Sequence, residues 1–187
     1  MQVTRSRIAG VLVMESEPVL DERGWFVRTF DADVAREHGV RAEDFVQDSV
    51  SRSHRGVVRG LHVRTGRGEA KLVRCSRGAL LDVVVDLRPG SPTYGEWEGF
   101  ELTEESQRSV YIPAGCAHGF QSLREPSDTS YRIDRPHDPA ESLAIAHDDP
   151  DLAVAWPLPV TCLSAGDRAA RPLSEVRHLL GPALPAR

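Results

Sequence analysis

The sequence predicts an all-β protein, a sandwich or barrel built from short strands with only a few helices. Short segments rich in β-branched and aromatic residues recur along most of the chain. Turn residues separate these segments, among them Gly56, Gly66, Gly68 and Gly78. We find no internal repeat and no low-complexity stretch. Many short strands divided by such turns are typical of a sandwich or barrel.

The strands are expected in the following order. The N-terminal part holds three candidates, at residues 11–14, 25–30 and 45–53. Three closely spaced strands follow, at 57–63, 71–75 and 79–87. The remaining five are expected at 98–102, 109–113, 118–123, 130–133 and 143–146.

Two short helices are expected at the periphery. Residues 33–38 form one candidate, which ends at Gly39. Residues 174–180 form the other, with Ser174 as its N-cap and Gly181 after its end. The following tail, residues 181–187, is expected to be loose.

Length and composition limit the classes of protein that are possible. The 187 residues suit a single domain over 1–187, and 40% hydrophobic with 27% charged residues is the mix of a soluble globular protein. A formal net charge of −5 argues against a general nucleic-acid binder. The apolar run at residues 8–14 is too short to span a bilayer and lacks a cleavage site, so we expect neither a membrane partner nor a secretory signal.

The cysteines and the basic residues carry two further signals. Cys75, Cys116 and Cys162 are odd in number and widely spaced, which fits a reducing, cytoplasmic setting.

Of the 23 basic residues, only Lys71 is a lysine. A lysine offers a compact ammonium that can be aimed at one oxygen, whereas an arginine offers a broad planar fork. A lone lysine among arginines therefore indicates a position where arginine does not serve.

Two segments stand out within the β pattern, residues 56–64 and residues 113–119. The second has the P-x-G-x-x-H spacing that resembles the second motif of cupins, which are small jelly-roll barrels. Metal-binding cupins carry H-x-H in the first motif, but here only His62 is present and Arg64 takes the second position. A cation there repels a metal, although His62, Glu69 and His118 still form a possible two-His-one-carboxylate set. We expect no bound metal.

The polar residues of this region suit proton transfer next to a carbonyl group. A histidine acts as a general base near neutral pH, and His62 is the candidate. Lys71 can stabilise negative charge that develops on an oxygen, and Tyr131 can return a proton. Arg59 can bind a phosphate group.

Nine stretches together resemble the dTDP-4-dehydrorhamnose 3,5-epimerases and related nucleotide-sugar epimerases. They cover most of the chain, from about residue 11 to residue 172, and each alone would be weak. The stretches are DERGWF (21–26), GVVRGLH (56–62), AKLV (70–73), DVVVDLR (82–88), SPTYG (91–95), IPAGCAHGF (112–120), DDPDL (148–152), WP (156–157) and LS (163–164).

The resemblance implies a cupin-type jelly-roll homodimer that epimerises carbons beside the C4 keto group of a deoxyhexose nucleotide without a cofactor. In this family pattern, His62 matches the general base and Asp167 its carboxylate partner. Tyr131 matches the proton donor on the other face, and Lys71 lies beside the enolate oxygen. The matched substrate contacts are Arg59 and His118 for diphosphate and sugar, and Arg23, Phe26 and Gln47 for the nucleotide. In the dimer, residues 11–14 and 25–30 are expected to be buried.

The chain also departs from the family pattern, mostly at substrate-binding positions. The departures are Arg28 for Glu, Ser49 for Asn, Arg64 for Gln, Ser142 for Glu, Gly166 for Lys, and Pro136-His137 for an aromatic pair. These changes leave the proton-transfer residues intact, so they bear on the choice of sugar and nucleotide. Three alternatives to the epimerase stay open: a 3,4-ketoisomerase, a non-catalytic sugar-nucleotide-binding protein and a metal-dependent dioxygenase.

Overall fold

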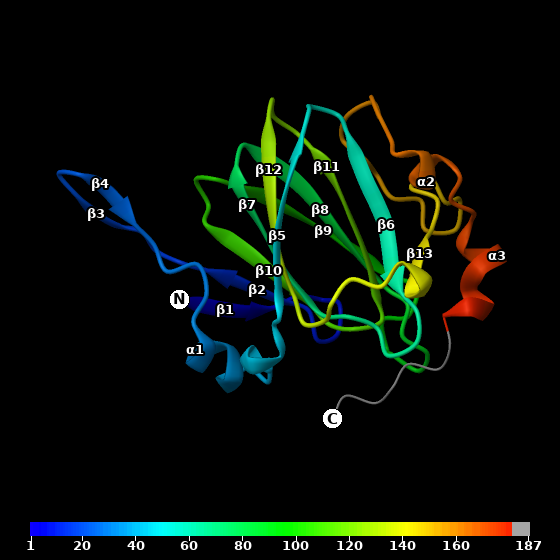
Figure 1. Cartoon of the computed structure of the whole chain (residues 1–187), viewed down its shortest axis with the longest axis horizontal. Helices are drawn as coiled ribbons and strands as arrows, with labels where there is room; N and C mark the ends of the chain where they lie inside the picture. Colours follow the sequence, from blue (N-terminus) through cyan, green and yellow to red (C-terminus); the bar gives the residue numbers. More distant parts are fainter. Residues whose placement is uncertain (181–187) are drawn as a thin grey trace.

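The computed structural model describes residues 1–180, in which the strands form two facing sheets and a projecting two-stranded arm (Figure 1). The six-stranded sheet has the order β1 (Gln2–Arg5), β2 (Leu12–Glu15), β10 (Arg108–Ile112), β7 (Lys71–Arg77), β12 (Ser127–Ile133) and β5 (Gln47–Ser53). The five-stranded sheet has the order β13 (Ser142–Ala144), β6 (Val58–Arg64), β11 (Cys116–Ser122), β8 (Ala79–Asp86) and β9 (Trp97–Thr103). The arm pairs β3 (Val19–Asp21) with β4 (Gly24–Phe26).

Helices in the described part are short and lie outside the sandwich. The α-helices are α1 (Ala32–Glu37), α2 (Ala165–Arg168) and α3 (Leu173–Val176), and the 3-10 turns are η1 (Ala42–Asp44), η2 (Pro139–Glu141) and η3 (Arg177–Leu179). The prediction of an all-β jelly roll with a few peripheral helices is confirmed. None of these helices is long and apolar enough to cross a membrane.

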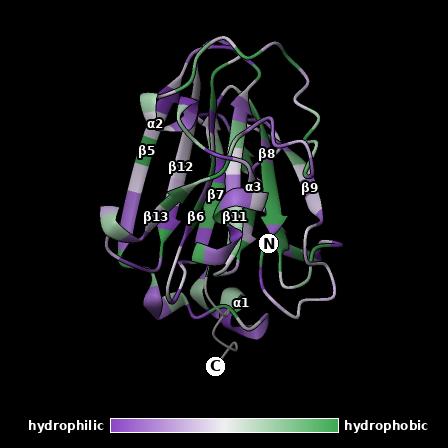
Figure 2. Ribbon diagram, turned by 90° about the vertical axis from the view of Figure 1, so that its right-hand side faces the viewer, coloured by the Kyte–Doolittle hydropathy of each residue, from purple (hydrophilic) through white to green (hydrophobic). Residues whose placement is uncertain are grey.

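The main core lies between the two sheets. Strand β8 is apolar along most of its length because it is buried on both faces. Leu80 and Val84 point into the sandwich, whereas Val83 and Val85 point to the opposite face. There they pack against the chain's C-terminal part, including Leu173 of α3. Both faces of β8 are therefore buried, and β8 is coloured as hydrophobic in Figure 2.

A smaller core anchors the N-terminal part against the six-stranded sheet. Leu12 and Met14 of β2 pack with Ala35 of α1 and with Leu72 of β7. β2 is an interior strand, paired on one side with β1 and on the other with β10. Val11, Leu12 and Met14 are thus buried by the chain's own core, so their apolar character does not require a second subunit.

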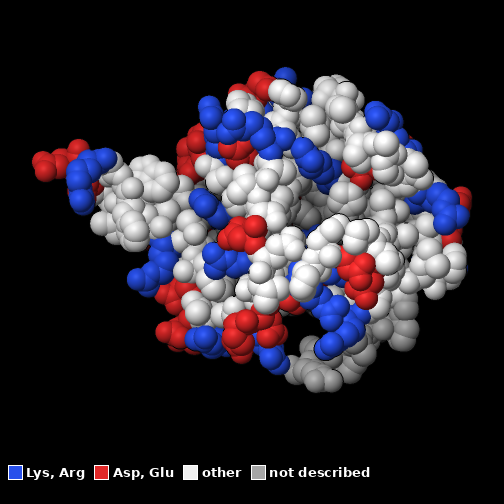
Figure 3. All heavy atoms as spheres, viewed as in Figure 1, with Lys and Arg blue, Asp and Glu red and all other residues white. Residues whose placement is uncertain are grey.

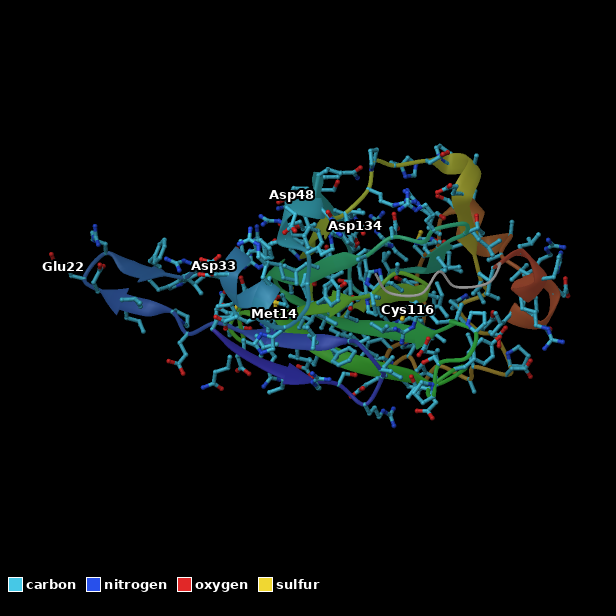
Figure 4. The ribbon with its side chains drawn as sticks, turned by 90° about the horizontal axis from the view of Figure 1, so that it is seen from below. Met14, Glu22, Asp33, Asp48, Cys116 and Asp134 are labelled. Carbon is cyan, nitrogen blue, oxygen red and sulfur yellow. The ribbon has the colours of Figure 1, made fainter. Side chains whose placement is uncertain are left out.

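The predicted strand at residues 25–30 is shorter than expected. β4 ends at Phe26, because the arm has left the sandwich and no third strand pairs with it. The arm is the long extension in Figure 1, and Figure 4 shows Glu22 at its tip.

The C-terminal helix begins one residue earlier than predicted, and Ser174 is not its N-cap. Pro172 precedes the first turn, and the amide of Leu173 donates to Oδ2 of Asp149. A carboxylate 24 residues away thus supplies the cap, and local sequence gives no sign of it. The predicted helix at 33–38 is confirmed with a shift of one residue, and it starts at the N-cap Asp31. Gly181 and the tail 181–187 lie outside the described residues.

An irregularity in β6 decides which of its side chains reach the space between the sheets. β11 pairs His118 with His62 but Phe120 with Arg59, so the register shifts between these pairs. Gly60 lies at the shift with φ of 133°, and a Cβ there would lie 2.5 Å from the Cα of Gly119. Because of the shift, Arg59 and His62 face the same cavity although they are three residues apart.

Candidate active site

A cavity of about 540 Å³ opens between the two sheets and gathers most of the predicted site residues. Arg59, His62 and His118 enter it from the five-stranded sheet. Lys71, Tyr131 and Gln47 enter it from the six-stranded sheet. Asp167 lines it from α2, and the remaining lining residues are Ser49, Ser51, Val63, Arg64, Glu69, Phe120, Ile133, Arg135, His137, Ser142, Leu143, Ala144, Ser164 and Gly166.

His62 and Asp167 form a hydrogen-bonded pair. His62 Nε2 lies 2.6 Å from Oδ1 of Asp167, which is buried. Burial alone would raise the pKa of Asp167, but the hydrogen bonds from His62 and Ser164 outweigh it and place this pKa below its usual value. The ionised carboxylate is placed to accept a proton from Nε2, and a neutral imidazole with the proton on Nε2 has its lone pair on Nδ1.

The loop before α2 fixes Asp167 beneath His62. The Ser164 side chain caps α2 by accepting from the amide of Asp167 at 3.0 Å, and it donates to Oδ2 of Asp167 at 2.9 Å. The same segment is bridged to Val57, just before β6, by Cys162, whose backbone oxygen accepts from the amide of Val58 at 3.2 Å. Residues 105 positions apart in the sequence thus form one rigid pair.

Tyr131 reaches the cavity from the sheet opposite to His62. Its hydroxyl lies 2.7 Å from Oγ of Ser51 on the neighbouring strand β5. Its ring packs against His118 and Phe120, each with ring centroids 6.3 Å apart. Burial raises the pKa of Tyr131 to about 12, so the hydroxyl keeps its proton at neutral pH.

Lys71 lies in a nearly buried group of three charges. Its Nζ is 3.0 Å from Oε1 of Glu69, whose other oxygen is 3.1 Å from Nε of Arg64. Arg64 also donates to the backbone oxygen of Pro136 at 2.7 Å. The lone lysine of the sequence therefore points into the cavity, with a carboxylate bridging it to an arginine.

A second histidine pair lies deeper, next to the first. His118 Nε2 is 2.7 Å from Oδ1 of Asp82, and both side chains are buried. His118 is also the direct cross-strand neighbour of His62. Asp82 holds His118 in one orientation at the floor of the cavity.

Arg59 supplies a positive charge that no carboxylate within residues 1–180 neutralises. Its Nε donates to Oγ of Ser53 at 3.0 Å, and its Nη2 donates to the backbone oxygen of Arg52 at 3.0 Å. Arg135 adds a second positive charge, 3.9 Å from Glu141. The cavity is thus locally positive in a protein of net charge −5, which suits an anionic ligand. Over the face drawn in Figure 3, by contrast, basic and acidic side chains are interspersed.

Two predicted substrate contacts lie outside the cavity of their own chain. Arg23 is in the turn of the arm and pairs with Asp21, while Phe26 ends β4 and is 70% exposed. The third nucleotide contact, Gln47, does line the cavity, where Oε1 accepts from the amide of His137 at 3.1 Å.

The structure adds polar residues that sequence reasoning had not assigned to the site. Ser51 and Ser164 orient Tyr131 and Asp167, and Asp82 orients His118. Asp82 could be noticed in the sequence, because it is one of two carboxylates inside the otherwise apolar run 79–87. Ser51 left no such sign, since Tyr131 lies 80 residues further along the chain, whereas Ser164 precedes Asp167 by three residues, the spacing of a helix N-cap.

The side chains considered for a metal are held in other contacts. His62 pairs with Asp167, His118 with Asp82, and Glu69 with Lys71 and Arg64. Within residues 1–180 we find no group of three His, Cys, Asp or Glu side chains arranged to hold a metal ion.

The jelly-roll sandwich, with an oriented His–Asp pair, a tyrosine and a lysine around one cavity, defines a cupin-like enzyme. Residues 5–175 match the family model described as dTDP-4-dehydrorhamnose 3,5-epimerase, and the chain belongs to this family. It is therefore an isomerase, a carbohydrate epimerase.

Three relatives illustrate the range of this family. The dTDP-4-dehydrorhamnose 3,5-epimerase of Methanothermobacter thermautotrophicus is 41% identical over 91% of this chain and 94% of its own. A dTDP-4-dehydrorhamnose 3-epimerase of Streptomyces niveus is 42% identical over 91% of this chain and 83% of its own. The structure of a Legionella pneumophila 3,5-epimerase in complex with dTDP-4-keto-L-rhamnose has a TM-score of 0.91 and 38% identity, and the match covers 98% of each chain.

Proposed function

We propose that the protein epimerises a dTDP-4-keto-6-deoxyhexose, inverting C3, C5 or both, through an enolate and without a cofactor. One observation carries the proposal: His62 with Asp167 and Tyr131 enter the same cavity from opposite sheets, with Lys71 beside them. Epimerisation requires a base on one face of a carbon and an acid on the other. The names of the relatives supply the class of substrate.

The proposed reaction moves one proton off the substrate and another one on. Nδ1 of His62 removes the proton from the carbon next to the C4 carbonyl, and Asp167 stabilises the imidazolium that forms. The electron pair of the broken C–H bond moves onto the carbonyl oxygen, whose negative charge Lys71 stabilises. The Tyr131 hydroxyl then protonates the same carbon from the opposite face. Exchange with solvent finally returns a proton to Tyr131 and removes one from His62.

Arg59 is proposed to bind the diphosphate, and His118 the sugar. Several residues that depart from the family pattern also line the cavity. They are Ser49, Arg64, Ser142, Gly166 and, from the pair Pro136-His137, only His137. Since they surround intact proton-transfer residues, we propose that they adapt the cavity to a particular sugar or nucleotide. Arg28, the remaining departure, pairs with Asp31 outside the cavity.

Arg23 and Phe26 can contact a nucleotide only if the arm reaches another molecule. We therefore propose a homodimer in which the arm is covered by the partner. We also propose a cytoplasmic location, which is supported by three cysteines that all remain free thiols.

The test is incubation with dTDP-4-keto-6-deoxyglucose in D₂O, followed by NMR of the sugar protons and analysis of the product. Deuterium at C3 and C5 with inversion identifies a 3,5-epimerase, and deuterium at C3 alone identifies a 3-epimerase. A 3-keto product would instead identify a ketoisomerase. Absence of exchange with bound substrate would identify a binding protein and overturn the proposal. His62→Ala serves as the inactive control.

A further inference from the structure

The proposed mechanism leaves Glu69 without a role, although it lies within the cavity next to Lys71. Its carboxylate bridges two cations: Oε1 lies 3.0 Å from Nζ of Lys71, and Oε2 lies 3.1 Å from Nε of Arg64. The exposed fractions of the three side chains are 13% for Glu69, 12% for Lys71 and 5% for Arg64. Charges so poorly hydrated interact strongly with one another.

The charge balance of this group depends on Arg64. If Glu69 were paired with Lys71 alone, its negative charge would cancel the positive charge with which Lys71 stabilises the substrate. With Arg64 present, the three side chains carry one net positive charge. Arg64 Nε lies close to the carboxylate without the alignment of a hydrogen bond, so this contact acts through charge.

The geometry also limits where the ammonium can lie. Lysine has a flexible stem, and a free ammonium would sample many positions in a cavity of this size. The ion pair with Glu69 draws the ammonium toward one side of the cavity, and its N–H groups can still donate to a substrate oxygen. Arg64 is itself held in place by its hydrogen bond to the backbone oxygen of Pro136.

We propose that Glu69 is a positioning residue for Lys71, and that Arg64 balances the charge of Glu69 so that the ammonium of Lys71 retains its positive charge toward the substrate. This inference rests on the proposed function, in which Lys71 stabilises the enolate oxygen. It explains why an arginine is tolerated at position 64 of a cavity that already holds other cations.

A cycle of three variants tests the coupling: Glu69→Gln, Arg64→Gln and the double variant. In Arg64→Gln, Lys71 and Glu69 form a neutral pair, so we expect kcat to fall by about tenfold or more. In Glu69→Gln, the anchor is lost and two cations repel each other, so we expect a similar fall. The double variant restores one net positive charge, so its kcat should exceed that of Arg64→Gln. A double variant whose loss equals the product of the two single losses would overturn the inference.

Further measurements separate positioning from a structural role. Because Glu69 contacts Lys71 and Arg64, its substitution should act on kcat and on the rate of hydrogen exchange in D₂O, with KM changed by no more than about twofold. If a single variant does not fold, Glu69→Asp keeps all three charges but withdraws the carboxylate from Lys71. It should lower kcat with an unchanged melting temperature, and wild-type kcat in this variant would overturn the inference.

A matched control uses an exposed ion pair on the turns of the sandwich. Arg124 Nη1 lies 2.6 Å from Oε1 of Glu105, and both side chains are at least half exposed. The variants Arg124→Gln and Glu105→Gln should leave kcat unchanged. Wild-type protein that neither exchanges nor epimerises the substrate would contradict the proposed function itself, whereas an active wild type with an uncoupled cycle would contradict only the role of Glu69.

Discussion

Tyr131 and His62 face each other from different sheets, so a substitution at Tyr131 should separate proton removal from inversion. Tyr131→Phe keeps the ring packing against His118 and Phe120 and removes only the acidic proton. We expect the variant to exchange substrate hydrogen with D₂O while its rate of epimer formation falls by about 10²-fold or more. His62→Ala should lose both activities. NMR of the sugar protons, together with product analysis, distinguishes these outcomes, and wild-type inversion by Tyr131→Phe would show that another group donates the proton.

The same geometry makes Lys71 sensitive even to a change that conserves its charge. Lys71→Arg replaces a compact ammonium by a broad guanidinium in a space bounded by Glu69 and Arg64. We expect kcat to fall by about 10²-fold, the usual cost of a lost oxyanion donor. The check is steady-state kinetics beside circular dichroism, which should show an unchanged fold. Turnover near the wild-type rate would mean that the single lysine in the sequence is accidental.

At the scale of elements, the end of β8 is fixed by a buried carboxylate outside the cavity between the sheets. Asp86 accepts hydrogen bonds from Arg88 Nη2 at 2.6 Å and from Thr93 at 2.7 Å, and it is fully buried. Burial would raise the pKa of Asp86, but the hydrogen bonds from Arg88, Ser91 and Thr93 outweigh it and lower the pKa to about 2.

This lowered pKa predicts an acid-sensitive contribution to folding stability. The folded protein holds the Asp86 proton less tightly than the unfolded chain does, so the contribution is present above the unfolded pKa of about 4 and is lost as pH falls through about 2. It amounts to about 2 kcal/mol at neutral pH. Asp86→Asn should lower the free energy of unfolding by about this amount at pH 7 and by less near pH 3, measured by urea denaturation. The exposed Asp148→Asn is the control, and a loss independent of pH would contradict the assignment.

The elements that could be predicted from the sequence are those whose signals are local. The apolar run at 79–87 became β8, and the helix candidate at 33–38 became α1, because a continuous apolar, β-branched run and a helix cap are both signals within the segment itself. The start of α3 could not be predicted, since its cap comes from Asp149 across the fold. The end of β4 was missed because an isolated arm has the composition of a strand but no neighbour that extends it.

The same distinction holds for the site: the sequence indicated some of its residues, whereas other contacts arise only from the fold. Residue chemistry selected His62, Lys71 and Tyr131, the family resemblance added Asp167, and all four line one cavity. Strict strand alternation would place Arg59 and His62 on opposite faces, and only the register shift at Gly60 brings them together. The contacts of Glu69 depend on side-chain placement in a loop, which no spacing in the sequence reveals.

For the whole molecule, the arm argues for a second subunit. An isolated two-stranded hairpin is only marginally stable in water, yet this arm exposes Val19, Leu20, Trp25 and Phe26. We expect light scattering at micromolar concentration to give about twice the chain mass of 20.6 kDa. Leu20→Ser with Phe26→Ser should shift the protein toward monomer while the sandwich stays folded, because both side chains lie on the arm. A monomeric wild type would contradict this prediction.

If the dimer places each arm in the partner's cavity, two differently impaired chains should restore one working site. His62→Ala keeps the arm but lacks the base, and the double variant Arg23→Ala/Phe26→Ala keeps the base but lacks the arm contacts. We expect the first to be inactive and the second to have a raised KM. Co-expressed with different tags and purified as a heterodimer, they should recover about half of the wild-type activity at low substrate, because one cavity then has both an intact base and an intact arm. If the arm served the cavity of its own chain, or made no contact with substrate, the heterodimer would show no recovery beyond the activity of the arm variant.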